Sequence, residues 1–242
     1  MEKLTRMQVV KLAKQTGVVS GYDLSGLDMR NLDLVAVTFS GSNLKDADLS
    51  SSNAGMSNFD DADLSGCNMS SANFIGASFK KASLEKSDLT FSSFAGADFS
   101  GANLKGVNFT NSKISAADFG GADLSGANLQ MTEAVLIRGA GATFYGISAF
   151  GSSMIGADLS GADLRKAMLH GTDLSGANMS SADLREADII ETVLIAVNLS
   201  NADLRGARVR TADTLRAKFD NIKADDNVKK ELVPDDKPDQ PG

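Results

Sequence analysis

The sequence predicts an all-β solenoid, a coil of short straight segments about ten turns long with a square cross-section. The first observation is a five-residue repeat. Stepping by five from Leu24 to Phe219, without a change of frame, 35 of the 40 central residues are Leu, Phe, Met, Ile or Val. Two positions before the centres, 32 of 40 residues are Ala, Ser, Thr or Cys. This period fits neither an α-helix nor an alternating strand, so every unit must include a turn.

The size of one coil follows from residues that recur every twenty positions. The members of two such columns are expected to form the structural core: Phe39, Phe59, Phe79, Phe99 and Phe119 in one, and Leu24 and Leu44 in the other. Four units then make one coil, with corners expected at the Asp/Asn, Ser and Gly positions, because these residues tolerate turn geometry. At about 4.8 Å between adjacent strands, ten coils make a rod about 48 Å long.

The four columns of units are named sides 1 to 4, and they begin at Tyr22, Leu27, Leu32 and Val37. The twenty-residue periods from 22–41 to 202–221 are named coils 1 to 10. The predicted domains are an N-terminal capping helix over 1–21, the β-helix over 22–221, and a short helix with a disordered C-terminal tail over 222–242.

The capping helix is predicted because the end of a solenoid exposes core and unpaired backbone. Leu4, Met7, Val10 and Leu12 fall near one face of this segment, and Gly17 is a stop signal. The small positions of coil 1 hold large residues, which would support a helix resting on them. The alternative is a membrane-surface or secretion helix that uses the net charge of +3 over residues 1–21.

Two stretches depart from the repeat. Between 132 and 153, three of the four central residues are Ala or Gly instead of large apolar residues. Ile137 and Ile147 take the small positions, so the total side-chain volume of the interior is roughly kept. This favours a distorted, continuous coil, with a projecting loop as the alternative. After Phe219 the repeat ends, and we expect a short helix within 223–232 followed by a disordered tail.

The units resemble those of the pentapeptide-repeat family, whose pattern is A(D/N)LXX. Units such as Ala-Asp-Leu-Ser-Gly at 122–126 and 157–161 carry the match, which extends over about 22–221. The resemblance implies a right-handed quadrilateral β-helix. It also implies one specific function, since some members mimic duplex DNA, bind gyrase and topoisomerase IV, and protect bacteria from quinolones.

The composition supplies few residues that could act in catalysis or bind a metal ion. We therefore expect no enzyme activity, no cofactor and no metal. Cys67, the one cysteine, occupies a small inward position, and His170 is the one histidine. The net charge of −7 argues against direct binding of nucleic acid or an anionic membrane. Neither a signal peptide nor an apolar span of about 20 residues is evident, so we expect a cytoplasmic bacterial protein, with secretion by another route left open.

Function is therefore expected on the surface, and the four sides differ in charge. Sides 1 to 4 carry 16, 8, 6 and 10 charged residues. The pairs that follow the centres of side 3 include one charged residue, Arg216. We expect these pairs to form a flat uncharged wall, a feature that marks interaction sites. The predicted interface residues are Val35, Met56, Ile75, Val135, Leu136, Ile155, Ile195 and Leu215.

These observations favour a non-enzymatic protein-interaction scaffold whose side 3 binds a protein partner or, as a homodimer, a second copy. One alternative is a DNA mimic that binds type II topoisomerase. The acidic total fits that role, but the net charge of −8 over 22–221 is spread as −2 on each side. Another alternative is a secreted bacterial effector or a structural component of a phage or particle.

Overall fold

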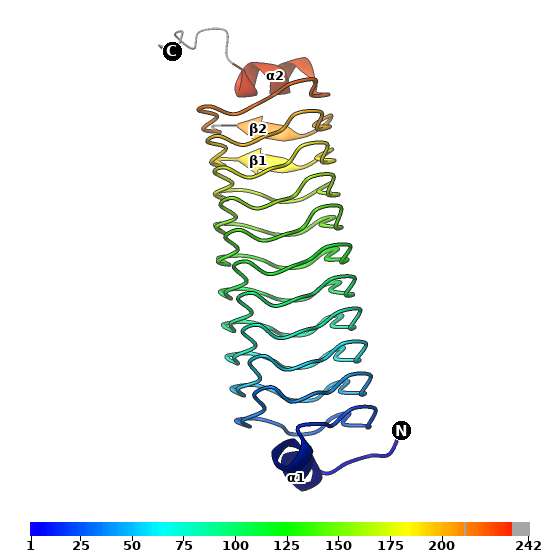
Figure 1. The fold of residues 1–242 in the computed structure, drawn as a ribbon. Coiled ribbons are helices and arrows are strands. Elements are labelled where there is room, and N and C mark those ends of the chain that lie inside the picture. The colour runs from blue at the N-terminus through cyan, green and yellow to red at the C-terminus, as the bar shows by residue number, and fades with distance from the viewer. Residues whose placement is uncertain (211, 234–242) are drawn as a thin grey trace.

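The computed structural model describes residues 1–210 and 212–233, which form a long β-helical solenoid (Figure 1). The helix α1 (Arg6–Thr16) lies at one end of the rod and α2 (Asp226–Leu232) at the other. Apart from Val233, the tail predicted to be disordered lies outside the described residues.

Residues twenty apart pair in parallel along the rod. The bridges run at this offset from Lys3 with Asp23 to Asp203 with Lys223. Two paired segments are regular strands, β1 (Asp188–Ile190) and β2 (Arg208–Arg210). The other pairings are single bridges, because every five-residue unit turns before a longer strand can form.

The corners lie at the two residues that follow each centre. After Phe74, the Ala77 amide donates to the Phe74 carbonyl at 3.0 Å, and Gly76 has a φ of +66°. A type II turn has this bond and needs a positive φ at its third residue. The prediction that the Asp/Asn position before the centre is a corner is wrong, because Asn73 lies in the paired stretch there, whereas the Ser and Gly positions after the centre do form the corner. Asn73 Oδ1 accepts a hydrogen bond from the Ile75 amide at 3.1 Å and so stabilises the corner from outside it.

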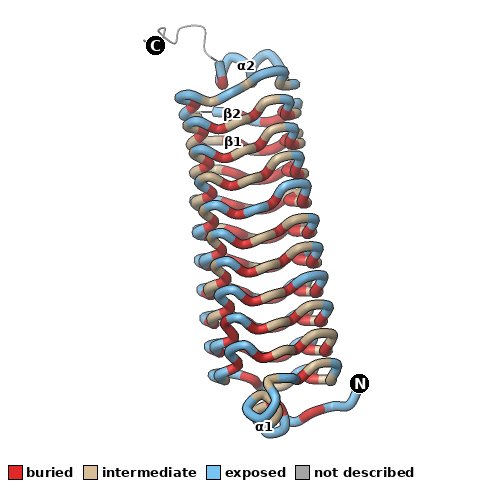
Figure 2. Tube along the Cα trace, in the orientation of Figure 1, coloured by how far each residue is buried: buried red, intermediate tan, exposed pale blue. Residues whose placement is uncertain are grey.

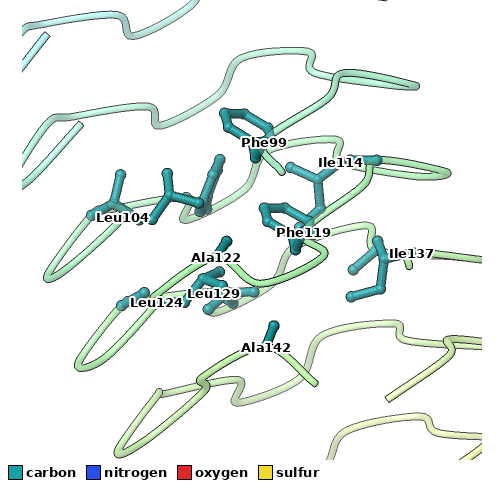
Figure 3. Packing of buried hydrophobic residues seen from close by; sticks show 14 of the residues in the cluster. Phe99, Leu104, Ile114, Phe119, Ala122, Leu124, Leu129, Ile137 and Ala142 are labelled. Carbon is teal, nitrogen blue, oxygen red and sulfur yellow. The ribbon is translucent and has the colours of Figure 1, made fainter. Parts of the chain in front are cut away.

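The interior is filled by stacked side chains, and all seven predicted core residues lie in it, fully buried. The rings of the phenylalanine column from Phe39 to Phe119 stack in parallel, with centroids 5.0 or 5.1 Å apart. Figure 3 shows Phe99 and Phe119 one above the other, and Leu104 and Leu124 likewise. Buried residues recur along every coil (Figure 2).

Side 3 carries buried hydroxyls at many of its small inward positions. Thr172 Oγ1 donates to the Ala149 carbonyl at 2.7 Å, and Thr192 Oγ1 donates to the Leu169 carbonyl at 2.8 Å. Each acceptor lies 23 residues earlier, at the side 2 centre just before the corner to side 3 in the preceding coil. The hydroxyls therefore connect adjacent coils and leave no buried polar atom unpaired at these positions.

The helix α1 packs on the first coil through a face that differs from the predicted one. Thr5 is its N-cap and forms a capping box with Gln8, so the helix begins at Arg6. Val9 is fully buried and Leu12 packs against the core, whereas Met7 is 83% exposed. The prediction for Met7 is therefore corrected, because a helix that starts at Arg6 turns this position outward. Val10 is half-buried, and Leu4 is buried just before the helix.

The weak stretch between 132 and 153 continues the coil without a projecting loop. Arg138 pairs with both Asp118 and Asp158, at the usual offset. Ile137 and Ile147 are buried at the small positions. A Cβ at Gly139 would lie 2.8 Å from Cζ of Phe144, so the missing side chain at this centre makes room for the ring.

The C-terminal helix α2 lies against the last coil. Val228 and Leu232 are buried in the common core. Thr214 Oγ1 donates to the Leu232 carbonyl at 3.1 Å. The short helix expected within 223–232 is present, and it is seven residues long.

Candidate protein-binding face

The corner after each centre of side 3 separates the two residues of the outward pair. The first residue of each pair stays on side 3, as the bonds from the Ile75 amide to Asn73 and from the Leu215 amide to Asp213 indicate. The second residue has a positive φ, such as +57° at Met56 and at Leu136, and turns towards side 4. The flat wall predicted from the sequence is therefore one edge of side 3, with Met56 and Leu136 on the far side of the corner.

Six of the predicted interface residues remain on side 3 itself. The four most exposed, Val35, Ile75, Ile155 and Leu215, are 39–49% exposed, and the other two are half-buried. We name the six residues the apolar row: Val35, Ile75, Val135, Ile155, Ile195 and Leu215. The row offers apolar area that a binding partner could remove from water.

Met56 and Leu136 extend this apolar area beyond the corner, each next to a glycine of the following coil. A Cβ at Gly76 would lie 3.7 Å from Met56 Cγ, and one at Gly156 would lie 2.7 Å from Leu136 Cδ2. Both bulky side chains thus lean along the rod into space that a glycine leaves open. A bulky corner residue followed twenty positions later by glycine is the sequence signal for this packing.

A second apolar margin borders side 3 at its other corner, and the sequence analysis missed it. Phe91 and Met131 are 65% and 58% exposed and are the second residues of corners between sides 2 and 3. Phe91 lines a shallow hollow together with Asn73 and Lys113 of side 3. Among the described residues of coils 1 to 10, two other large apolar residues are exposed, Phe150 at the first position of a corner between sides 2 and 3 and Met168 on side 2.

A row of mostly polar residues runs between the two margins, at the paired position of each unit. Asn73 Nδ2 donates to Asn53 Oδ1 of the preceding coil at 2.9 Å. At the middle of the rod, Lys113 Nζ lies 4.0 Å from Glu133 Oε2, and both side chains are more than half exposed. Side 3 therefore combines a polar centre with an apolar margin on each flank.

Side 1, across the core from side 3, is charged and internally paired. Each of three arginines forms an ion pair with the aspartate two residues earlier, with nitrogen–oxygen distances of 2.6 or 2.7 Å: Arg165, Arg185 and Arg205. These hydrogen bonds lower the pKa of each of the three carboxyl groups below its usual value. The three Arg–Asp pairs are named the side 1 ladder. Their charges are compensated within the chain, which leaves less for a partner to bind.

The one cysteine and the one histidine occupy ordinary structural positions. Cys67 is buried, its Sγ donates to the Leu44 carbonyl at 2.9 Å, and burial raises its pKa to about 12. His170 lies at a corner, 3.2 Å from Glu191 and beside the ring of Phe150. Across residues 1–210 and 212–233, no group of three or more His, Cys, Asp or Glu side chains is placed to hold a metal ion. In the same ranges, no helix has the length and apolar character that crossing a membrane requires.

Comparisons with known proteins agree with this architecture. The model of the family described as pentapeptide repeats matches 8 copies, at residues 20–53, 57–90, 92–130, 144–180 and 177–213. No curated protein matches the chain.

The solved structures similar to the chain include HetL and QnrB1. HetL, a pentapeptide repeat protein involved in heterocyst differentiation regulation from the cyanobacterium Nostoc sp. strain PCC 7120, is 24% identical, with a TM-score of 0.87 over 88% of this chain and 96% of that one. QnrB1, a plasmid-mediated fluoroquinolone resistance protein, is 21% identical, with a TM-score of 0.49 over 88% of this chain and 95% of that one. The first similarity supports the β-helical fold. The extent of the repeat match shows that the chain belongs to the pentapeptide-repeat family.

Proposed function

We propose that this protein is a non-enzymatic interaction scaffold that binds another protein through side 3. The observation that carries the proposal is the distribution of exposed large apolar residues, which gather on the two margins of side 3. Covering a half-exposed Ile, Leu or Val contributes about 1 kcal/mol, so the four most exposed members of the apolar row contribute about 4 kcal/mol before the entropy cost of association.

The rest of the molecule supports this role as a rigid frame. In the proposal, ten coils hold side 3 straight, and α1 and α2 act as caps that cover the ends of the rod. Val9 at one end and Val228 with Leu232 at the other bury apolar surface that open ends would expose. Covered ends prevent association of unpaired backbone edges, so binding is directed to the sides.

The test is a binding comparison between the natural chain and the variant Ile75→Lys with Ile155→Lys, which places two charges on side 3. The control variant, Ser65→Lys with Ser125→Lys, places the same charges at the first position after the centre on side 1, in coils 3 and 6. Proteins captured from an extract by the natural chain and by the control should be at least about tenfold depleted with the side 3 variant. Equal capture by all three proteins would contradict the proposal.

Topoisomerase binding is the second function proposed, and the net charge of −7 favours it. Many acidic groups are, however, already paired with bases, as in the side 1 ladder. A DNA mimic needs uncompensated negative charge along one flank. Inhibition of gyrase supercoiling by the purified protein would favour the mimic, and unchanged supercoiling would exclude it.

A further inference from the structure

We infer that the partner of side 3 is a second copy of this chain, bound face to face and antiparallel. The two-fold axis lies in the interface and crosses the rods between Lys113 and Glu133. This inference rests on the proposed function, because it names the occupant of the same face. Its evidence is the self-complementarity of side 3 in charge and in side-chain size.

The axis position follows from the length of the rod. Lys113 is the paired residue of side 3 in coil 5, and Glu133 is its equivalent in coil 6. They are therefore the two middle residues among ten coils. A two-fold axis between them sets coil 5 opposite coil 6 of the second copy and coil 4 opposite coil 7, and so on to the ends.

The charges at the centre are complementary in this arrangement. Lys113 lies opposite Glu133 of the partner subunit, and Glu133 lies opposite Lys113 of the partner subunit. Both side chains are more than half exposed, and the one ion pair that either forms among residues 1–210 and 212–233 is their mutual contact at 4.0 Å, so each can also reach across. A parallel pair would instead set Lys113 against Lys113 of the partner subunit, and like charges in contact are unfavourable.

The apolar row matches large residues with small ones across the same axis. Ile75 lies opposite Ser175 of the partner subunit, and Ile155 lies opposite Ala95 of the partner subunit. The remaining matches are Val135 with Ser115 of the partner subunit, Ile195 with Gly55 of the partner subunit, and Val35 with Leu215 of the partner subunit. Bulky side chains thus meet small ones or, at the end, another apolar one, which allows close packing.

The other margin contributes its exposed aromatic residue. Phe91 in coil 4 lies opposite Gly151 of the partner subunit in coil 7. Met131 covers that glycine within each chain, since a Cβ at Gly151 would lie 2.9 Å from the Met131 sulfur. The Phe91 ring therefore meets a thioether, a favourable contact for an aromatic ring.

The available area is of the size that a stable dimer needs. A face about 48 Å long and about 16 Å wide, three extended residues at about 3.3 Å each with a margin of about 3 Å at each corner, covers about 770 Å². Specific interfaces bury about 800 Å² per partner. One match is unfavourable: Asp33 lies opposite Asp213 of the partner subunit. It falls at the outer ends of the face, where water and salt screen charges most effectively.

The first test exchanges charges between separate chains and measures mass by sedimentation. The natural chain should be dimeric at about 100 µM, and Lys113→Glu or Glu133→Lys alone should weaken self-association at least about tenfold. Mixing the two variants restores opposite charges at both central contacts, so a heterodimer should form. A monomeric natural chain, or a mixture as monomeric as its components, would overturn the inference. Circular dichroism of each variant verifies that the fold is retained.

The second test examines the register by disulfide formation between chains. Ser93 lies opposite Ser153 of the partner subunit, so Ser93→Cys mixed with Ser153→Cys should give a cross-linked heterodimer under mild oxidation. The matched control uses Ser83→Cys with Thr143→Cys, which occupy the same coils on side 1 and should remain uncross-linked. Equal cross-linking of the two mixtures would overturn the inference.

The outcomes separate this inference from the proposed function. A monomeric natural chain whose captured proteins are lost with the lysine variant of side 3 would overturn the antiparallel dimer and leave the scaffold in place. A monomeric natural chain whose captured proteins are unaffected by that variant would overturn both.

Discussion

The phenylalanine stack provides a direct energetic test of the coil register. Phe79 is fully buried, and its ring stacks on those of Phe59 and Phe99 at centroid distances of 5.0 Å each. We predict that Phe79→Leu and Phe99→Leu each destabilise the protein by about 3 kcal/mol, about 1 for changed packing and about 1 for each of the two stacked ring pairs that are lost.

The double variant should cost less than the sum of the two single variants. The ring pair shared by Phe79 and Phe99 is lost once, not twice, so the coupling energy should be about 0.5–1.5 kcal/mol. The matched control is Phe79→Leu with Phe119→Leu. These rings lie two coils apart, about 10 Å, where coupling should stay below about 0.5 kcal/mol.

The assay is urea unfolding of the five variants and the natural chain, followed by far-ultraviolet circular dichroism and analysed by linear extrapolation. Equal coupling in the two pairs, or stronger coupling between Phe79 and Phe119, would refute the twenty-residue register in the interior.

Three further predictions concern corners, charge and the thiol. Gly156→Ala should lower the free energy of unfolding by about 2 kcal/mol, because the added Cβ would lie 2.7 Å from Leu136 and alanine is also strained at a positive φ. Gly161→Ala has the same sign of φ but open space around the added Cβ, so it should cost about 1 kcal/mol. Urea unfolding measures both values. The hydrogen bonds of the side 1 ladder lower the carboxyl pKa values, so they stabilise the fold fully when the pH is above the usual carboxyl pKa of 3.8. This stabilisation is lost as the pH falls through the lowered pKa values. Arg185→Met should therefore lower the melting temperature at about pH 7, with a smaller difference at about pH 2, and a constant difference would contradict the assignment. Cys67 should react with a thiol reagent only after unfolding, because its pKa is about 12 and it is buried, so rapid labelling of the native protein would contradict its placement.

Much of the architecture was accessible from the sequence because each unit has one place for one large side chain. The phenylalanine column could be read as a stack, since an interior with a twenty-residue period leaves each ring no other neighbour along the rod. The uncharged character of side 3 was also evident, because the outward positions repeat at the same interval.

The details that the sequence analysis missed depend on where a turn starts. Apolar spacing alone predicts the wrong face for Met7, because the start of α1 is set by the capping box of Thr5 and Gln8. The repeat assigns Phe91 and Met131 to side 2, whereas a positive φ at the second corner residue redirects each side chain towards side 3. Periodicity gives the column of a residue, whereas only the turn geometry gives the side on which it is displayed.

Distances between spin labels on two copies of the chain test the central claim most directly, namely that side 3 joins two antiparallel copies. Labels at Ser78 in coil 3 and at Asn198 in coil 9, introduced separately on side 4, lie outside the proposed interface. Across the two-fold axis, identical labels should be separated along the rod by five coil spacings, about 24 Å, for Ser78, and by seven, about 34 Å, for Asn198. Equal separations at the two sites, or no dipolar coupling between copies, would contradict the account.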